Sequence, residues 1–255
     1  MIMPRASTSR PSPAGHAPPA LSLWPQRGWR RRELAPVLGL GLAAGAGAAA
    51  IGLADADAPS EAETLDGALL LALRAPGDLA DPLGPHWVEE AARDFTGLGG
   101  VAMLTFVVLS AALFLALAGK RASALAVCIA GGGAALLGVV LKGWFDRPRP
   151  DLVPHAVRAL NESFPSGHAT GAAAVYLTLG VLLARAVPDP EAKLWLVVVT
   201  IAVTLMVAAS RVYLGVHWPT DVLAGVAVGA AWASLCWLVE VSLQKRGAVE
   251  PTEDR

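Results

Sequence analysis

Residues 122–141 read ASALAVCIAGGGAALLGVVL, a run that contains no charged residue. About 20 apolar residues in a helix are enough to cross the hydrocarbon core of a bilayer. Comparable runs occur at 34–53, 98–118, 169–187, 194–210 and 222–243, separated by charged residues, proline or glycine. The pattern predicts an all-α integral membrane protein, a six-helix bundle with one helix per run.

The composition agrees with a membrane location. Of 255 residues, 55% are hydrophobic and only 16% are charged, and the mean hydropathy is +0.52. So large an apolar fraction must be covered by lipid. The formal net charge of -1 gives no basic surface for a polyanion, which excludes nucleic acid as a partner.

The two ends of the chain differ from the apolar part. Residues 1–33 are rich in Pro, Ser and Arg, which is typical of a disordered tail, and 244–255 form a second short tail. The domain between them spans 34–243. Its first run, 34–53, has two interpretations: a membrane span, or a signal peptide cleaved after Ala56. The run exceeds the roughly 7 to 15 apolar residues of a signal peptide, which favours a span.

Charge predicts the orientation in the plasma membrane. Positive residues of short loops stay in the cytoplasm. If the spans alternate, one side receives Arg30–Arg32, Lys120, Arg121, Arg185, Lys193, Lys245 and Arg246. Both termini are then cytoplasmic, and 55–97, 142–168 and 210–221 lie outside. The outer segments nevertheless carry cations, which predicts an anion site there: Lys142, Arg147, Arg149, Arg158 and Arg211.

The first polar cluster is the segment 142–150, KGWFDRPRP, at the end of the third span. It brings Lys142 and Arg149 to the outer side. Taken alone, it is equally well explained by cations that reach the membrane interface beside Trp144.

The second cluster is the segment 164–170, FPSGHAT, directly before an apolar run. Ser166 is a good helix N-cap, and Gly167 lets an anion approach the free N–H groups of the first turn. An ordinary capped helix with an incidental His168 explains the same residues.

The third cluster is the segment 210–221, SRVYLGVHWPTD. Pro219 suits the first turn of the last helix, so that His217 precedes this helix and Asp221 lies within its first turn. A carboxylate bonded to one ring nitrogen would leave the other nitrogen free to attack. The alternative is an interfacial histidine beside a helix-capping aspartate.

Together the clusters place two histidines, several cations, a helix start and a carboxylate at one face of the membrane. Polar groups near membrane depth are costly, so their convergence indicates a functional site. Phosphoryl transfer requires this combination of fixed cations, backbone donors, an in-line nucleophile and an acid for the leaving oxygen.

In this order, the clusters resemble the signature of the type 2 phosphatidic acid phosphatase superfamily, which also includes the vanadium haloperoxidases. Its three parts are K-x6-R-P, P-S-G-H and S-R-x5-H-x3-D, and they match 142–150, 165–168 and 210–221 without departure. The signature region is therefore 142–221.

The resemblance implies that His217 attacks phosphorus to form a phosphohistidine, oriented by Asp221, and that His168 protonates the leaving oxygen and later activates water. It implies no metal ion and no cofactor, and it assigns no role to Arg147. The residues implied to hold the phosphoryl group are Lys142, Arg149, Ser166, Gly167 and Arg211.

We therefore expect a metal-independent phosphatase that acts outside the membrane on a lipid mono- or diphosphate: undecaprenyl diphosphate first, then phosphatidic acid or phosphatidylglycerol phosphate. Two alternatives remain open, a haloperoxidase-like enzyme with vanadate in the same pocket and a non-catalytic phospholipid-binding protein. Because His217 must be neutral and His168 protonated, the activity should have a bell-shaped pH dependence.

Overall fold

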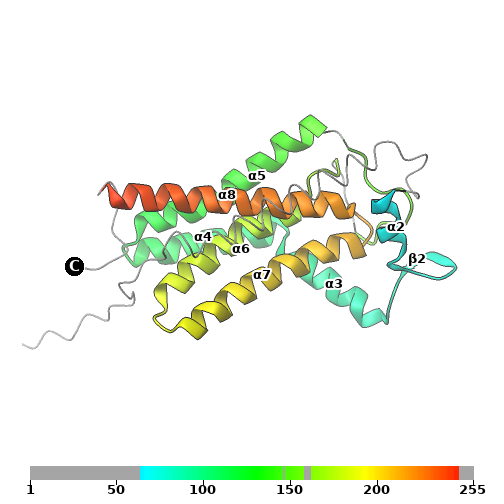
Figure 1. The fold of residues 1–255 in the computed structure, drawn as a ribbon, viewed down its shortest axis with the longest axis horizontal. Helices are drawn as coiled ribbons and strands as arrows, with labels where there is room; N and C mark the ends of the chain where they lie inside the picture. Colours follow the sequence, from blue (N-terminus) through cyan, green and yellow to red (C-terminus); the bar gives the residue numbers. More distant parts are fainter. Residues whose placement is uncertain (1–63, 146, 158–161, 247–255) are drawn as a thin grey trace, which may run out of the picture.

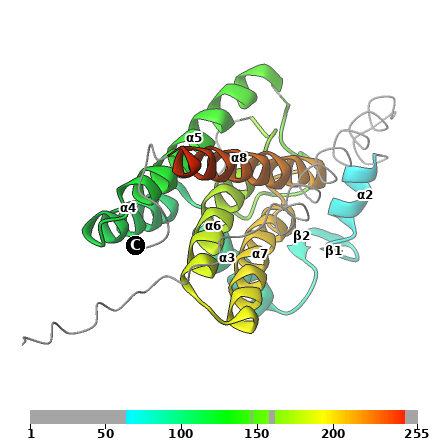
Figure 2. The same cartoon turned by 60° about the vertical axis from the view of Figure 1, so that its left-hand side comes forward.

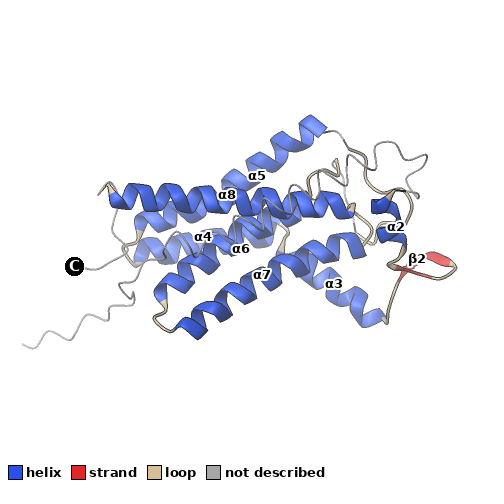
Figure 3. Cartoon of the chain, in the orientation of Figure 1, coloured by secondary structure: helices blue, strands red, loops and turns tan. Residues whose placement is uncertain are grey.

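The computed structural model describes residues 64–145, 147–157 and 162–246. They form helices and one small antiparallel hairpin (Figures 1 and 3). In chain order the elements are α2 (Leu65–Leu71), β1 (Arg74–Ala75), β2 (Asp78–Pro82), α3 (His86–Leu98), α4 (Val101–Leu117), α5 (Arg121–Phe145), α6 (Gly167–Ala186), α7 (Pro190–Tyr213) and α8 (Pro219–Lys245). The prediction of a helical membrane protein is confirmed.

Within the described residues, four helices, α5 to α8, are long and apolar enough to cross a membrane. Helices α3 and α4 pass the same test together, although they meet at a bend of 49°. The run 34–53 lies outside the described residues, so the count of six spans stays a prediction.

The second predicted span, 98–118, differs from the structure. Of this run, Val101–Leu117 forms α4 and Leu98 ends α3, which precedes α4 at an angle. The break falls at Gly99-Gly100, where two residues of low helix propensity adjoin. The segment 55–97, which is predicted to lie outside, contains α2, the hairpin and most of α3 in its described part.

The surface of the bundle is strongly apolar. On α4, the side chains of Val101, Phe106 and Leu117 are 82%, 67% and 81% exposed. Contiguous apolar surface of this kind is unfavourable in water and is required against lipid acyl chains. The outer faces of these helices therefore fit a bilayer.

Helix α6 lies at the centre of the bundle and packs against α5, α7 and α8. Its inner face is built from small residues, among them the fully buried run 172–174 of alanines. Gly225 lets α8 approach closely, because a Cβ at this position would lie 2.7 Å from the carbonyl oxygen of Ser166 and 3.1 Å from the Cβ of Ala169. Small residues allow such close backbone approach between membrane helices. The start of α8 is thereby fixed against the start of α6.

The two ends of the bundle have different contents. The connections α4–α5 and α6–α7 lie at the same end as the last turns of α8 (Figure 1). Helix α2 and the hairpin lie at the opposite end, beside the junction of α7 and α8, and the turned view keeps this arrangement (Figure 2). The polar clusters that flank α5, α6, α7 and α8 therefore gather at the end that carries α2.

Candidate active site

His217 lies in the short connection 214–218 between α7 and α8. The connection turns at Gly215, whose φ of +76° is the left-handed conformation that favours glycine. A Cβ at Gly215 would also lie 2.8 Å from Cγ2 of Val153 and 2.9 Å from Nη2 of Arg74. The turn buries the imidazole of His217 to 2% exposure.

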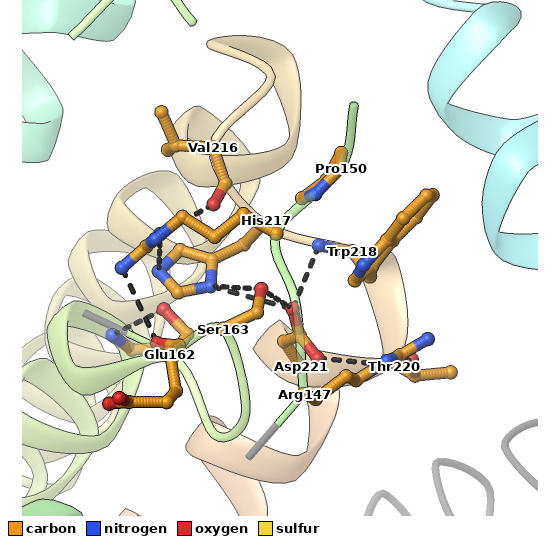
Figure 4. Close-up of polar contacts among 12 residues, drawn as sticks. Arg147, Pro150, Glu162, Ser163, Val216, His217, Trp218, Thr220 and Asp221 are labelled. Atoms are coloured by element: carbon orange, nitrogen blue, oxygen red, sulfur yellow. Dashed lines mark hydrogen bonds and ion pairs between the residues drawn. The ribbon is translucent and has the colours of Figure 1, made fainter. Parts of the chain in front are cut away.

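Asp221 is the third residue of α8 and reaches back over the start of the helix, as the sequence predicts. Its Oδ2 accepts a hydrogen bond from the N–H of Trp218 at 3.0 Å and lies 3.5 Å from Nδ1 of His217. Ser163 adds a further contact, since its hydroxyl donates to Oδ2 of Asp221 and lies 3.3 Å from the same Nδ1 (Figure 4). The Nδ1 side of the ring therefore faces a carboxylate and a hydroxyl.

Burial sets the protonation of His217. Desolvation by burial is the main reason that the pKa of its imidazole is lowered to about 4. The hydrogen bond with Asp221 raises this pKa, and the charge of Arg149 lowers it. The ring is neutral at pH 7, which is the form that can act as a nucleophile.

The Nε2 side of the same ring faces cations. Nη1 of Arg149 lies 3.1 Å from Nε2 of His217 and donates to the carbonyl of Val216 at 2.6 Å. The carbonyl oxygen of Glu162 accepts from Lys142 and lies 3.5 Å from Nη2 of Arg149. Lys142 and Arg149 thus converge on one oxygen atom, the carbonyl oxygen of Glu162. Burial lowers the pKa of Arg149, which nevertheless stays charged at neutral pH.

Arg211 approaches from α7, in the last turn of the helix. It is 4% exposed, and its Nη1 donates to Oγ1 of Thr96 in α3 at 2.8 Å. His168, the second residue of α6, interacts electrostatically with Arg211 and with His217. Its Nε2 lies 4.0 Å from the place where a Cβ of Gly100 would be, so the break between α3 and α4 packs beside this ring.

The start of α6 completes the set. Ser166 is the N-cap, as predicted, and its side chain accepts from the N–H of Ala169. Its own N–H donates to the carbonyl of Asp221 at 3.0 Å, which ties α6 to α8. The Cε of Lys142 lies 3.9 Å from the place where a Cβ of Gly167 would be. The structure thus brings all eight predicted residues together at one end of the bundle.

Arg147 has contacts that the sequence did not reveal. Its Nη1 donates to Oδ1 of Asp221 at 2.8 Å and to Oγ1 of Thr220 at 2.7 Å, and its Nη2 donates to Oδ2 of Asp66 at 2.8 Å. The guanidinium also lies 5.6 Å from the ring centroid of Trp218. Its only sequence signal was a positive charge in a segment predicted to lie outside, two residues before Arg149.

The sequence of this chain was compared with those of known proteins and families. The family model described as PAP2 superfamily matches residues 121–244. Phosphatidylglycerophosphatase B of Bacillus subtilis (strain 168) is 36% identical over 146 residues, which cover 56% of this chain and 70% of that protein. Undecaprenyl-diphosphatase of Sulfolobus acidocaldarius is 36% identical over 95 residues, or 36% of this chain and 38% of that protein.

A solved structure agrees over most of the fold. The crystal structure of a transmembrane PAP2 type phosphatidylglycerolphosphate phosphatase from Bacillus subtilis superposes with a TM-score of 0.68 at 28% sequence identity. The match covers 81% of this chain and 96% of that chain. The motifs, the arrangement of the helices and the relatives agree, and this chain belongs to the PAP2 superfamily.

Proposed function

We propose that this protein is a membrane-embedded, metal-independent phosphatase that hydrolyses a phosphate mono- or diphosphate ester of a lipid. One observation carries the proposal. Nδ1 of the buried imidazole of His217 faces Asp221 and Ser163, while its Nε2 faces Arg149. A neutral histidine held in this way directs one lone pair at a site lined by cations, which suits attack on phosphorus.

In the first step, Nε2 of His217 forms a bond to phosphorus while the bond from phosphorus to the leaving lipid oxygen breaks. His168 gives its proton to that oxygen, which leaves as a lipid alcohol or, from a diphosphate, as a lipid monophosphate. Asp221 and Ser163 hold the positively charged imidazole that develops.

In the second step, His168 takes a proton from water, and the water oxygen attacks phosphorus as the bond from phosphorus to nitrogen breaks. Inorganic phosphate leaves, and His217 becomes neutral again. The charge on the phosphoryl oxygens in both steps would be stabilised by Lys142, Arg149 and Arg211, together with the first N–H groups of α6.

The substrate and the side of the membrane are part of the same proposal. The relatives are named for phosphatidylglycerophosphate and undecaprenyl diphosphate, both phosphorylated lipids. A third relative, from Mycolicibacterium smegmatis, is named decaprenylphosphoryl-5-phosphoribose phosphatase and is 40% identical over 47% of this chain and 62% of its own length. The count of positive residues supports cytoplasmic termini and a site at the outer face of the plasma membrane.

The test is phosphate release from purified protein in detergent, with EDTA present, on a panel of undecaprenyl diphosphate, phosphatidic acid and phosphatidylglycerol phosphate. Wild type should release phosphate from at least one lipid, and His217→Ala should release none. Binding of a lipid without release would establish a non-catalytic protein. Vanadate-dependent halide oxidation would establish the haloperoxidase alternative.

A further inference from the structure

Asp66 is a buried carboxylate that the reaction above does not use. It lies in the first turn of α2, whose N-cap Thr64 accepts from the N–H of Gly67 at 2.8 Å. Its side chain is 1% exposed. Burial of a carboxylate is costly unless cations and hydrogen-bond donors compensate, so the partners of Asp66 indicate why it is there.

The partners of Asp66 come from distant parts of the chain. Oδ1 accepts from the N–H of Thr220 at 2.9 Å, and Oδ2 accepts from the hydroxyl of Thr220 and from Nη2 of Arg147 at 2.8 Å. The N–H of Thr220 is one of the first donors of α8, so Asp66 caps this helix from a separate segment. Asp66 thereby fixes the turn that carries Asp221.

Arg147 connects the two carboxylates. Its Nη2 is held by Asp66 while its Nη1 binds Oδ1 of Asp221. The other oxygen of Asp221 receives Ser163 and the N–H of Trp218 and faces His217. Each oxygen of Asp221 therefore accepts at least one hydrogen bond, and these bonds to the two oxygens fix the orientation of the carboxylate.

The charges of this chain of contacts matter as much as its geometry. Two carboxylates, Asp66 and Asp221, share the guanidinium of Arg147, so Arg147 offsets only part of the charge that Asp221 directs at the imidazolium of His217. Without Asp66, the single positive charge of Arg147 would neutralise Asp221 alone. The field of Asp221 on His217 would then be weaker at the moment when the ring becomes positive.

We infer that Asp66 is a positioning residue of the active site, which acts through Arg147 and Thr220 to orient Asp221 and to preserve its charge toward His217. The inference rests on the proposed phosphatase function. It gives a role to the outer segment between the first apolar run and α3, since α2 supplies a group on which the catalytic carboxylate depends.

The variant that tests this inference is Asp66→Asn, which keeps the shape of the side chain and removes its charge. The kcat for phosphate release should fall on the order of ten- to a hundredfold, by analogy with metal sites, where removal of a group that orients a metal ligand has this effect. The KM should change little, because no contact with the substrate is lost. Asp78→Asn is the matched control, since Asp78 is exposed on β2 of the same segment, and it should behave as wild type.

A pH profile separates this role from a structural one. Loss of a negative charge disfavours the imidazolium of His217, so the limb of the kcat/KM profile that reports the ionisation of His217 should move to lower pH in Asp66→Asn. The substrate's own titration is common to both enzymes and cancels in the comparison. The groups that face His217 from the surrounding elements are Asp221 of α8, Arg149 of the segment after α5, His168 of α6 and Arg211 of α7.

A double-mutant cycle tests the route through Arg147. In an Arg147→Gln background the guanidinium that binds both Asp66 and Oδ1 of Asp221 is gone, so the added Asp66→Asn change should cost much less kcat than it does in wild type. The neutral Asn–Gln pair also avoids an unpaired buried charge, which keeps the double variant folded.

The outcomes are distinct. Wild-type kcat and an unmoved His217 limb of the pH profile in folded Asp66→Asn would overturn the inference, as would fully additive losses in the cycle. If wild type itself releases no phosphate from any lipid in the panel, the proposed function fails and not the role of Asp66 alone.

Discussion

Replacement of Gly225 by alanine should disturb catalysis although Gly225 itself takes no part in the reaction. The new Cβ would lie 2.7 Å from the carbonyl oxygen of Ser166, whereas an ordinary contact of a Cβ begins near 3.4 Å, so α8 must move from α6 by about 0.7 Å. Both groups belong to helix backbones, which cannot give way by rotating a side chain. The displacement changes the separation between His168, on α6, and His217, which precedes α8.

The magnitude follows from this displacement. A misplacement of about 1 Å can cost about a hundredfold in rate, so a shift of about 0.7 Å should lower kcat/KM at least about tenfold. Overpacking costs about 1–3 kcal/mol of stability, and the better helix propensity of alanine offsets about 1 kcal/mol of it. The fall in activity should therefore exceed what the small change in thermal stability explains.

The assay combines phosphate release with thermal unfolding in the same detergent. Gly132→Ala is the matched control, since Gly132 is an exposed helical glycine of α5 with no atom within 4 Å of its added Cβ, and its activity should stay at the wild-type level. Wild-type kcat/KM in Gly225→Ala would refute the view that the α6–α8 contact sets the distance between the histidines.

Three further predictions concern separate parts of the site. Because burial lowers the pKa of His217 from near 6.5 to about 4, the folded state resists this protonation. Its contribution to stability is complete above about pH 6.5 and is lost as the pH falls toward about 4, so the fall in Tm between pH 7 and 4.5 should be smaller in His217→Asn than in wild type. Thr96→Val removes the hydroxyl that accepts from Arg211 at 2.8 Å. Inhibition by inorganic phosphate should then weaken about tenfold, which corresponds to about 1.5 kcal/mol for a hydrogen bond to a charged group. An unchanged inhibition constant would contradict this positioning of Arg211. EDTA should leave the turnover of wild type unaltered, and a loss of activity that added divalent metal restores would contradict a mechanism without metal.

The helical fold could be predicted because a bilayer demands long apolar segments, and α5 to α8 satisfy this demand within a few residues of the predicted runs. The bend between α3 and α4 was not predicted, since the run 98–118 has no charged residue and no proline, and Gly99-Gly100 lowers helix propensity without fixing an angle. It depends on tertiary packing, for Gly99 lies against the backbone of His168.

The residues of the candidate site divide in the same way. His168, His217 and Asp221 could be found because they occupy fixed spacings beside helix starts. Asp66 and Thr96 could not, since they meet their partners across 154 and 115 residues and occur outside the signature. A contact over such a separation leaves no local pattern in the sequence.

The most direct test of the central claim is to trap the covalent intermediate. The protein is mixed with a lipid substrate carrying a labelled phosphoryl group and quenched in alkali, where a phosphohistidine survives, and the labelled peptide is then identified by mass spectrometry. The label should be on His217 and should be absent from His217→Ala, while His217→Ala releases no phosphate. Label on another residue, or undiminished turnover in His217→Ala, would contradict the claim that this histidine is the nucleophile.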